Sequence, residues 1–416
     1  MVRDQERGDT AAAAQSRRPL SLRPPPGQDN VPSSSMYYPY PSGRCVHYTL
    51  SSIHDEYGRA TAFSNIASKF RGGDNLPYDD ESTPSSDAPR PNPNPESQLG
   101  PRLANATFVM LARNSDLDGA MRAVRAVEDR FNTRHGYPYV FLNDVEFSSE
   151  FKRRMSVLTG FNAVFGVIPS DHWNQPDWID EDKATEARKS LVAANVKYGD
   201  SVPYRNMCRF NSGFFFKHPL LQKYRWYWRI EPNVQFHCNI LNDPFLFLEE
   251  NNKVYGFTIT VYEIAASIRS LWGHVTDFIA QHPEHIAEDN SMDFLSGNRG
   301  RTYNTCHFWS NFEIADMNFW RGPAYTDFFE HLDKTGGFYY ERWGDAPVHS
   351  IAASLFLRKD QIHFFEEIGY QHDDWSHCPL SEDLWIKGRC SCDQKHSFDY
   401  DGSSCKGRWD RFMNGS

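Results

Sequence analysis

The chain has 416 residues and a formal net charge of −10. This acidic balance argues against a nucleic-acid partner, because phosphate contacts require a clustered basic surface. The sequence has no run of 18 apolar residues and no apolar signal-peptide region, so it predicts neither a transmembrane helix nor a cleaved leader.

The front of the chain differs in composition from the rest. Its first 100 residues hold 13 of the 25 prolines and none of the 11 tryptophans. Such a segment cannot bury enough apolar surface to offset the entropy lost on ordering. We therefore predict a disordered Pro/Ser-rich stem over residues 1–101, with one helical patch at 57–70, and an ordered domain over 102–416.

The ordered domain is predicted to begin with a β-α-β unit. An apolar run at 106–111 is typical of a buried strand, and apolar residues at helical spacing follow over 117–131. A second strand is expected at 138–143, joined to the first by a right-handed crossover. Ser115 and Asp118 have the spacing of a capping box for the helix.

The remaining elements alternate in the same way. Strands alternating with helices predict an α/β fold whose sheet is covered on both faces. The glycine-rich phosphate loops of dinucleotide-binding and P-loop proteins are absent from the sequence. Further strands are expected at 163–168, 225–230, 254–260 and 361–368, and helices at 183–197, 321–334 and 347–357.

Two candidate metal ligands follow predicted strands. Glu231 comes directly after 225–230, and Pro232 prevents that strand from continuing as a central one. His372 follows 361–368, and the acidic residues after it could orient its ring. Because ligand crevices form at the carboxyl ends of strands, both side chains could hold a divalent cation against a diphosphate. The alternatives are an exposed turn glutamate and a structural histidine.

Two further carboxyl groups could carry chemistry. Glu313 lies in an aromatic segment, and a buried carboxyl group there suits acid-base or nucleophilic work. The alternative is a structural glutamate bonded to backbone amides. Asp345 is spaced as a helix N-cap with Pro347 just inside the helix, and it could either act only as a cap or face a sugar hydroxyl.

A basic segment at 203–210 combines the phenol of Tyr204 with the guanidinium groups of Arg205 and Arg209. Guanidinium groups match the geometry of phosphate oxygens, so these arginines are candidate donor-binding residues. The alternative is a surface loop.

Eight cysteines, four of them near the C-terminus, are typical of an oxidising compartment. We predict that the four cysteines of the tail are oxidised, with their pairing left open. The alternatives are buried free thiols and a zinc site that would use His377 with three of these cysteines. The tail cysteines are Cys378, Cys390, Cys392 and Cys405.

Eight segments match one known family in order along the chain. Together they resemble the fungal α-1,2-mannosyltransferases of glycosyltransferase family fifteen, and the resemblance continues into the cysteine-rich tail. The segments are NATFVMLARNSDL, VRAVEDRFN, YPYVFLND, YRNMCRFNSGFFF, YWRIEPNVQFHC, CHFWSNFEIA, YYERWGDAPVHSIA and IGYQHDDWSHCP.

The resemblance implies a GT-A type nucleotide-sugar transferase fold, in which a mixed central sheet flanked by helices forms one catalytic domain over 102–416. It implies retaining transfer of mannose from GDP-mannose to a mannose-terminated N- or O-linked glycan, in protein glycosylation and cell-wall mannoprotein synthesis. It also implies Mn²⁺ as the cofactor, a metal that oxygen and imidazole ligands suit.

The resemblance assigns roles to the candidate residues. It places the metal on Glu231 and His372 and the proposed nucleophile at Glu313. Retention by double displacement needs such a carboxylate on the sugar face opposite the leaving group. The contacts to the donor, acceptor and nucleotide map to Tyr204, Asp345 and Arg113.

Members of this family resemble type II membrane proteins, so the resemblance implies a place in the Golgi lumen. It implies membrane contact only if an anchor is missing from this sequence. Two other functions use the same residues. One is a retaining glycoside hydrolase with Glu313 and Asp345 as its carboxylate pair. The other is a non-enzymatic glycan-binding protein on a degenerate transferase fold.

Overall fold

The computed structural model describes residues 102–415. The stem predicted over 1–101, with its helical patch at 57–70, lies outside the described residues. Among residues 102–415, no helix combines the length and the apolar character needed to cross a bilayer.

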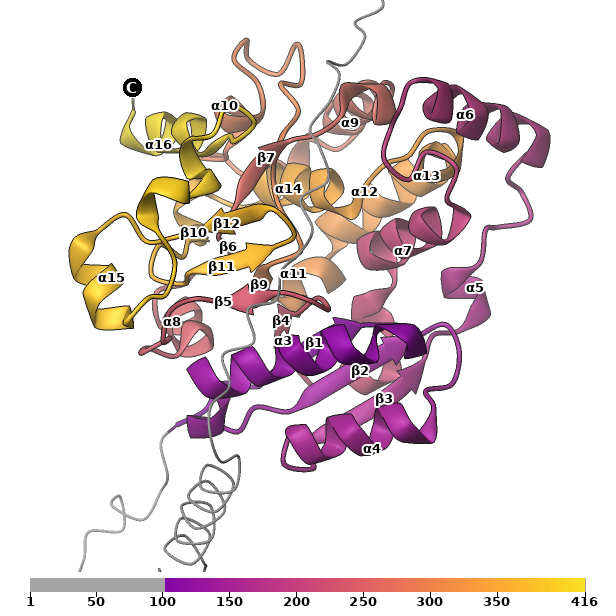
Figure 1. Ribbon diagram of the computed structural model, residues 1–416. Coiled ribbons are helices and arrows are strands. Elements are labelled where there is room, and N and C mark those ends of the chain that lie inside the picture. The colour runs from indigo at the N-terminus through magenta and orange to yellow at the C-terminus, as the bar shows by residue number, and fades with distance from the viewer. Residues whose placement is uncertain (1–101, 416) are drawn as a thin grey trace, which may run out of the picture. The chain divides into compact units, whose positions relative to one another are not determined.

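A seven-stranded sheet forms the centre of the described part (Figure 1). Its strands are β1 (Ala106–Leu111), β2 (Tyr139–Asn143), β3 (Ala163–Val167), β4 (Trp226–Arg229), β6 (Tyr255–Phe257), β9 (Glu313–Asp316) and β10 (Ile362–Phe364). Their order is β10-β6-β9-β4-β1-β2-β3. Strand β9 runs antiparallel to β4 and β6, whereas the other neighbouring pairs are parallel. The sheet is therefore mixed, as predicted.

Two smaller sheets complete the strand structure of residues 102–415. One joins β5, β11 and β12 in antiparallel fashion, and the other joins β7 to β8. Their bounds are β5 (Gln235–Phe236), β7 (Thr260–Tyr262), β8 (Cys306–Phe308), β11 (Tyr370–His372) and β12 (Trp375–His377).

The α-helices flank these sheets. They are α3 (Leu117–Arg130), α4 (Ser149–Leu158), α5 (Ser170–Trp173), α6 (Glu181–Ala193), α7 (Val202–Gly213), α8 (Pro244–Glu250), α9 (Leu271–Gln281), α10 (Met292–Leu295), α11 (Met317–Arg321), α12 (Pro323–Asp333), α13 (Gly337–Tyr340), α14 (Asp345–Phe356), α15 (Glu382–Gly388) and α16 (Lys406–Asn414).

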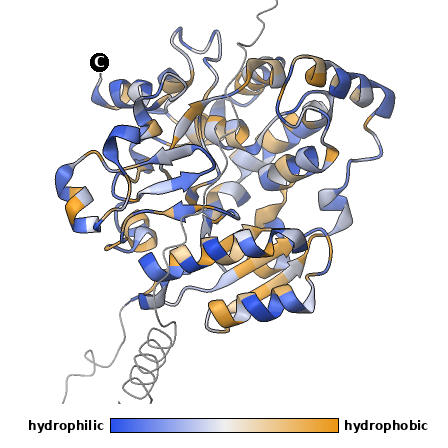
Figure 2. Cartoon of the chain, in the orientation of Figure 1, coloured by the Kyte–Doolittle hydropathy of each residue, from blue (hydrophilic) through white to orange (hydrophobic). Residues whose placement is uncertain are grey.

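Each face of the central sheet has its own core, because neighbouring residues of a strand point to opposite sides. Phe108 and Met110 of β1 pack with α3, α4 and α8, whereas Val109 packs with residues of α7, α12 and α14. Helices α3 and α4 accordingly alternate hydrophobic and hydrophilic residues in Figure 2. Burial on both faces explains why β1 and β2 read as continuous apolar runs.

Most predicted elements are present, with shifted ends. The strands expected at 106–111, 138–143, 163–168 and 225–230 are β1 to β4. The helices expected at 183–197, 321–334 and 347–357 are α6, α12 and α14. The single strand predicted at 254–260 is wrong, since the structure divides it between β6 and β7 in two different sheets.

The predicted capping box at Ser115 and Asp118 is also wrong. A 3₁₀ turn at Asn114–Asp116 precedes α3, and Asp116 occupies the N-cap position. The Asp116 carboxylate accepts hydrogen bonds from the backbone N–H and the guanidinium group of Arg113. The turn is thus closed at Arg113, whose backbone N–H donates to the carboxylate three residues later, as in one half of a capping box that begins two residues before the predicted one.

The tail cysteines are oxidised, as predicted, but two of them pair with cysteines outside the tail. The two partner cysteines outside the tail lie in the loop after β5 and in β8. These two disulfides therefore link the tail covalently to the rest of the domain. His377 donates from Nε2 to the backbone carbonyl oxygen of Glu366, and its Nδ1 lies 2.8 Å from the Asp399 carboxylate. Because the three cysteines of the zinc alternative are all in disulfides, that alternative is excluded. The bonds are Cys238–Cys390, Cys306–Cys405 and Cys378–Cys392, and Cys208 is a buried free thiol.

Candidate active site

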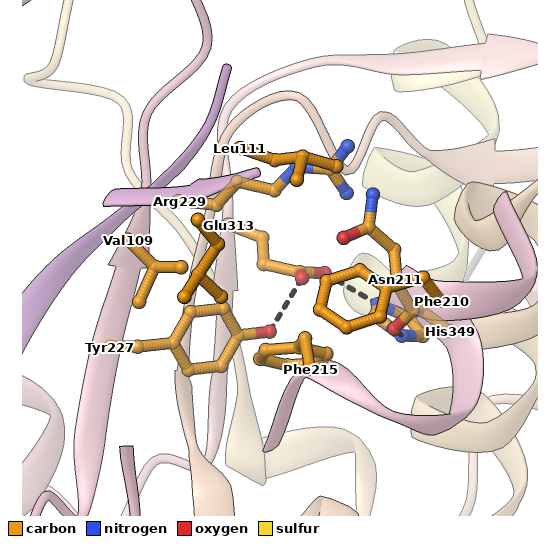
Figure 3. A pocket seen from close by; sticks show the side chains of 10 residues that line it. Val109, Leu111, Phe210, Asn211, Phe215, Tyr227, Arg229, Glu313 and His349 are labelled. Atoms are coloured by element: carbon orange, nitrogen blue, oxygen red, sulfur yellow. Dashed lines mark hydrogen bonds and ion pairs between the residues drawn. The ribbon is translucent and has the colours of Figure 1, made fainter. Parts of the chain in front are cut away.

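The pairing of β4 with β9 creates the candidate site. Arg229 at the end of β4 stands opposite Glu313 at the start of β9. Tyr227 lies two positions before Arg229, so its side chain points to the same face of the sheet. Together with Asn211 of α7 and His349 of α14, these residues line a pocket (Figure 3).

Side-chain donors surround the carboxylate of Glu313, which is only 1% exposed. The Tyr227 hydroxyl donates to Oε1, and the Tyr255 hydroxyl donates to Oε2 over 3.1 Å. Burial and the neighbouring Glu313 raise the pKa of both phenols, so both remain protonated donors. The alternative of a glutamate bonded to backbone amides is wrong, because its partners are side chains.

His349 is a further partner of Glu313. Its Nε2 lies 3.0 Å from the backbone carbonyl oxygen of Asn211, and a carbonyl oxygen only accepts, so Nε2 carries a hydrogen. Its Nδ1 lies 3.0 Å from Oε2 of Glu313. The Trp320 ring stacks on the imidazole with centroids 4.2 Å apart, which fixes the imidazole in this position.

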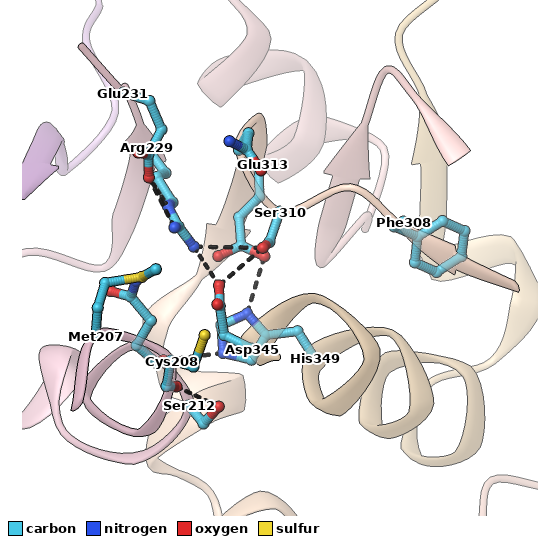
Figure 4. Close-up of polar contacts among 12 residues, drawn as sticks. Met207, Cys208, Ser212, Arg229, Glu231, Phe308, Ser310, Glu313, Asp345 and His349 are labelled. Carbon is cyan, nitrogen blue, oxygen red and sulfur yellow. Dashed lines mark hydrogen bonds and ion pairs between the residues drawn. The ribbon is translucent and has the colours of Figure 1, made fainter. Parts of the chain in front are cut away.

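Arg229 joins the pocket to the predicted metal ligand (Figure 4). Its Nη1 lies 2.5 Å from Oδ2 of Asp345, and its Nε lies 2.7 Å from Oε1 of Glu231. Burial disfavours a charged guanidinium, but Glu231, Asp345 and Glu313 outweigh it and raise the pKa of Arg229. One cation therefore positions carboxylates from two separate segments.

Asp345 is not the N-cap that the sequence predicts. Gly344 holds that position without a side-chain cap, and Asp345 is the first residue of α14. Its carboxylate accepts from Arg229 and, over 2.8 Å, from the Ser310 hydroxyl. Burial works against ionisation, yet the charge of Arg229 and these hydrogen bonds lower the pKa of Asp345. A capping role alone does not explain this residue.

Strand pairing brings the Glu231 and His372 segments together. In the smaller sheet, Gln371 pairs with Gln235 of β5, four residues after Glu231. The Tyr370 hydroxyl donates to the backbone oxygen of Asn311 over 3.0 Å. Burial and then the charge of Glu231 raise the pKa of Tyr370, which places that carboxylate close to the start of β11.

The orientation of His372 differs from the prediction. The side-chain amide of Asn311 lies 2.6 Å from Nδ1, and Trp309 stacks on the ring. Asp373 instead turns away at a positive φ of 49° and lies 3.9 Å from Lys197. An amide, not a flanking carboxylate, therefore orients the imidazole. Turning the amide about its terminal bond lets its oxygen accept the Nδ1 proton and leaves the Nε2 lone pair for a metal.

One carboxylate and one imidazole are a ligand set that fits a divalent cation whose remaining ligands come from a bound nucleotide. Within residues 102–415, no third histidine, cysteine or acidic side chain gathers with Glu231 and His372 into a full ligand cluster. Diphosphate oxygens and water would have to supply the remaining ligands.

Arg205 and Arg209 are not in a loop. The segment predicted as a possible surface loop forms α7, and both arginines are buried in it. The Arg205 guanidinium donates to backbone carbonyl groups, and Arg209 pairs with Asp333 at 2.7 Å. Both guanidinium groups are engaged within the protein, which argues for structural roles and against the predicted phosphate contacts.

The remaining two candidates, Tyr204 and Arg113, lie in separate parts of the fold. Tyr204 stacks against Tyr198, with centroids 4.6 Å apart, and the Arg342 guanidinium lies 5.2 Å from its ring centroid. Arg113 lies after β1, where its exposed side chain pairs with Asp116 at 3.0 Å. Arg113 is thus accessible in the first strand-to-helix turn, as expected.

Arg229 and His349 are not among the site residues predicted from the sequence, although a signal existed for each. Arg229 lies two positions before Glu231 across a strand end, and His349 lies four positions after Asp345 on one helical face. Tyr227 and Tyr255 carried no such signal, because each reaches Glu313 only through pairing between distant strands.

Comparisons with known proteins identify the family and the fold. The family model described as glycolipid 2-alpha-mannosyltransferase matches residues 74–414. Glycolipid 2-alpha-mannosyltransferase 2 of Candida albicans is 52% identical over 305 residues, which cover 73% of this chain and 66% of that protein. Alpha-1,2 mannosyltransferase KTR1 of Saccharomyces cerevisiae is 49% identical over 306 residues, covering 74% of this chain and 78% of that protein.

Solved structures of similar proteins share the fold. The S. cerevisiae mannosyltransferase Ktr4p in complex with GDP has a TM-score of 0.71 and 40% identity, covering 74% of this chain and 82% of that one. Core-mannan synthase A of Aspergillus fumigatus, in an Mn/GDP form, has a TM-score of 0.70 and 36% identity, covering 80% of this chain and 92% of that one. With the family match over most of its length, this chain belongs to the glycolipid 2-alpha-mannosyltransferase family, glycosyltransferase family fifteen.

Proposed function

We propose that this protein is a retaining α-1,2-mannosyltransferase that moves mannose from GDP-mannose to a mannose-terminated glycan. The observation that carries the proposal is the Glu313 pocket, where a buried carboxylate meets Arg229 beside the Glu231 segment. Relatives named as α-1,2-mannosyltransferases and a similar structure in complex with GDP support the same donor.

Glu231 and His372 are the proposed ligands of Mn²⁺, supported by the Mn/GDP form of core-mannan synthase A. A bound Mn²⁺ offsets negative charge on the departing diphosphate. Arg229 holds the Glu231 carboxylate at 2.7 Å. Asn311 fixes the His372 ring, so both ligands are oriented before the donor arrives.

Glu313 acts in the chemical step. A retaining enzyme develops positive charge at the anomeric carbon, and a carboxylate on the face opposite the leaving group stabilises or captures that charge. Three side chains hold the carboxylate in one orientation, and their hydrogen bonds stabilise its negative charge in a site from which water is excluded. These are Tyr227, Tyr255 and His349. Asp345 accepts a hydrogen bond from a sugar hydroxyl while Arg229 keeps it ionised.

The acceptor is a glycan of the secretory pathway. Three disulfides suit the oxidising lumen of that pathway, and the Golgi is the proposed site of action. The similarity to O-glycoside alpha-1,2-mannosyltransferase omh1 of Schizosaccharomyces pombe, 49% identical over 304 residues, supports O-linked acceptors beside N-linked ones. Protein glycosylation and cell-wall mannoprotein synthesis are the processes it would serve.

The test is a transfer assay with radiolabelled GDP-mannose, Mn²⁺ and α-methyl-mannoside. We expect a labelled disaccharide that an α-1,2-specific mannosidase cleaves, and no product after chelation of the metal. Calorimetry with GDP and Mn²⁺ separates the alternatives. A glycoside hydrolase would release mannose without binding GDP, and a glycan-binding protein would bind the acceptor without turnover.

A further inference from the structure

A second cluster of metal-ligating side chains lies away from the residues proposed for catalysis. It follows α9, in the segment His282-Pro283-Glu284-His285, whose last three residues form a 3₁₀ turn. The ligand atoms of His282, Glu284 and His285 all lie within 4.8 Å of one another. The Nδ1 atom of His282 is already 3.1 Å from Oε1 of Glu284.

A carboxylate on another helix sets the tautomer of His285. Oδ2 of Asp327, on α12, lies 2.9 Å from Nε2 of His285. The carboxylate accepts from Nε2–H, which leaves the lone pair of the neutral ring on Nδ1. Histidines that bind metals in proteins typically donate their other ring N–H to such a carboxylate, which orients the ring and raises its basicity.

A buried phenylalanine supports both imidazole rings. Phe278, on the last turns of α9, stacks on His282 with centroids 4.7 Å apart and on His285 with centroids 6.1 Å apart. The planes of the two imidazoles differ by only 15°.

We propose that His282, Glu284 and His285 bind one Zn²⁺ ion, with Asp327 as the residue that positions His285. Two imidazole nitrogens and one carboxylate oxygen with an open fourth position are a ligand set that zinc prefers, whereas Mn²⁺ favours oxygen ligands. Zn²⁺ would displace the proton between His282 and Glu284. The bound ion would join the end of α9 to α12 through Asp327.

The experiment measures Zn²⁺ binding to the full chain by competition with a chromophoric chelator. A Glu231→Gln, His372→Asn background removes the proposed catalytic metal ligands, so only other sites are counted. We expect one Zn²⁺ per chain. In that background, Glu284→Gln should weaken Zn²⁺ binding at least about tenfold, and Asp327→Asn should weaken it about tenfold without removing a ligand. Glu284 is exposed, so its substitution leaves the core intact.

His396→Ala is the matched control, because His396 is an exposed histidine 3.2 Å from Asp393 that lacks a third ligand. It should leave Zn²⁺ affinity unchanged. In the Glu231→Gln, His372→Asn background, Zn²⁺ should also raise the melting temperature, and it should do so much less when Glu284→Gln is added. Equal Zn²⁺ affinity in the Glu284→Gln, Asp327→Asn and parent proteins, or no stoichiometric binding at all, would overturn the proposal. None of these outcomes depends on mannosyl transfer.

Discussion

The hydrogen-bond partners of Glu313 support its proposed role in the chemical step. Its carboxylate faces a pocket, and two phenols and an imidazole hold it there. A carboxylate with only a structural role could accept all its hydrogen bonds from backbone N–H groups. At Glu313 the donors come from two neighbouring strands and from α14, an arrangement that orients charge at a defined point.

The first prediction concerns this charge. Glu313→Gln keeps the shape of the side chain but removes its negative charge, so the developing charge on the sugar loses its stabilisation. Turnover should fall at least about a hundredfold, with the affinity for GDP little changed. Transfer kinetics and GDP calorimetry measure the two quantities. Turnover close to that of the parent enzyme would show that Glu313 has no part in the chemical step.

The second prediction concerns Glu231 and His372, which we expect to act as one metal-binding unit. Replacing either by Ala should abolish Mn²⁺-dependent transfer, and the double variant should be little worse than either single variant. Mn²⁺ should bind weakly without GDP and much more tightly with it, because diphosphate oxygens complete the ligand set. Mn²⁺ titration with and without GDP provides the measurement. If His372→Ala retains both metal affinity and turnover, this ligand assignment is incorrect.

At the scale of elements, the tail from β11 onward is joined to the rest of the domain by disulfide bonds. Cys390 and Cys405 bond it to Cys238 and Cys306 of the domain, across separations of 152 and 99 residues. Disulfides that close long loops restrict the unfolded chain strongly. Because β11 carries His372, this attachment also holds a proposed metal ligand against β5.

The third prediction is a pH dependence in this tail. Burial alone would lower the pKa of His377, but the charge of Asp399 outweighs it and raises that pKa above the ordinary value. The stabilisation is therefore fully present below the pKa of the unfolded chain, about 6.5, and is lost as pH rises through the folded pKa. His377→Gln should destabilise the protein more at about pH 5.5 than at about pH 9.

Urea unfolding with the disulfides intact measures this difference. The exposed His396→Gln variant is the control, since its side chain is 84% exposed and should show little effect at either pH. The same loss of stability for His377→Gln at both pH values would contradict the proton-linked role of the His377–Asp399 pair.

For the whole molecule, the fourth prediction concerns the proposed division into a stem and a catalytic domain. The described part from residue 102 holds the whole proposed site, whereas the first 100 residues are rich in proline and lack tryptophan. Limited proteolysis should therefore remove the front of the chain to near residue 100 without loss of transfer activity. Mass spectrometry of the trimmed protein and a transfer assay check this. Loss of activity on trimming would refute the stem.

Much of this architecture was readable from the sequence. Apolar runs identified β1 to β4, and in β1 and β2 these runs are continuous because strands buried on both faces need apolar residues at nearly every position. Glu231 was a candidate because it follows a strand. His372 was a candidate because it follows the strand predicted at 361–368, which the structure shortens to β10, while His372 itself lies at the end of β11 in a different sheet. The family motifs added the fold and the donor class, since they extend in order over most of the chain.

Only the tertiary structure decided which distant residues meet. The register of β4 against β9 sets Arg229 opposite Glu313, and packing of α14 brings His349 to the same carboxylate. The apolar pattern of a single strand does not predict which of its residues pair with those of a neighbouring strand. The same limit explains the error at Arg205 and why the disulfide pairing stayed open. A guanidinium group can bind phosphate or backbone carbonyls equally well, and a cysteine pairs with whichever partner the fold brings within bonding distance.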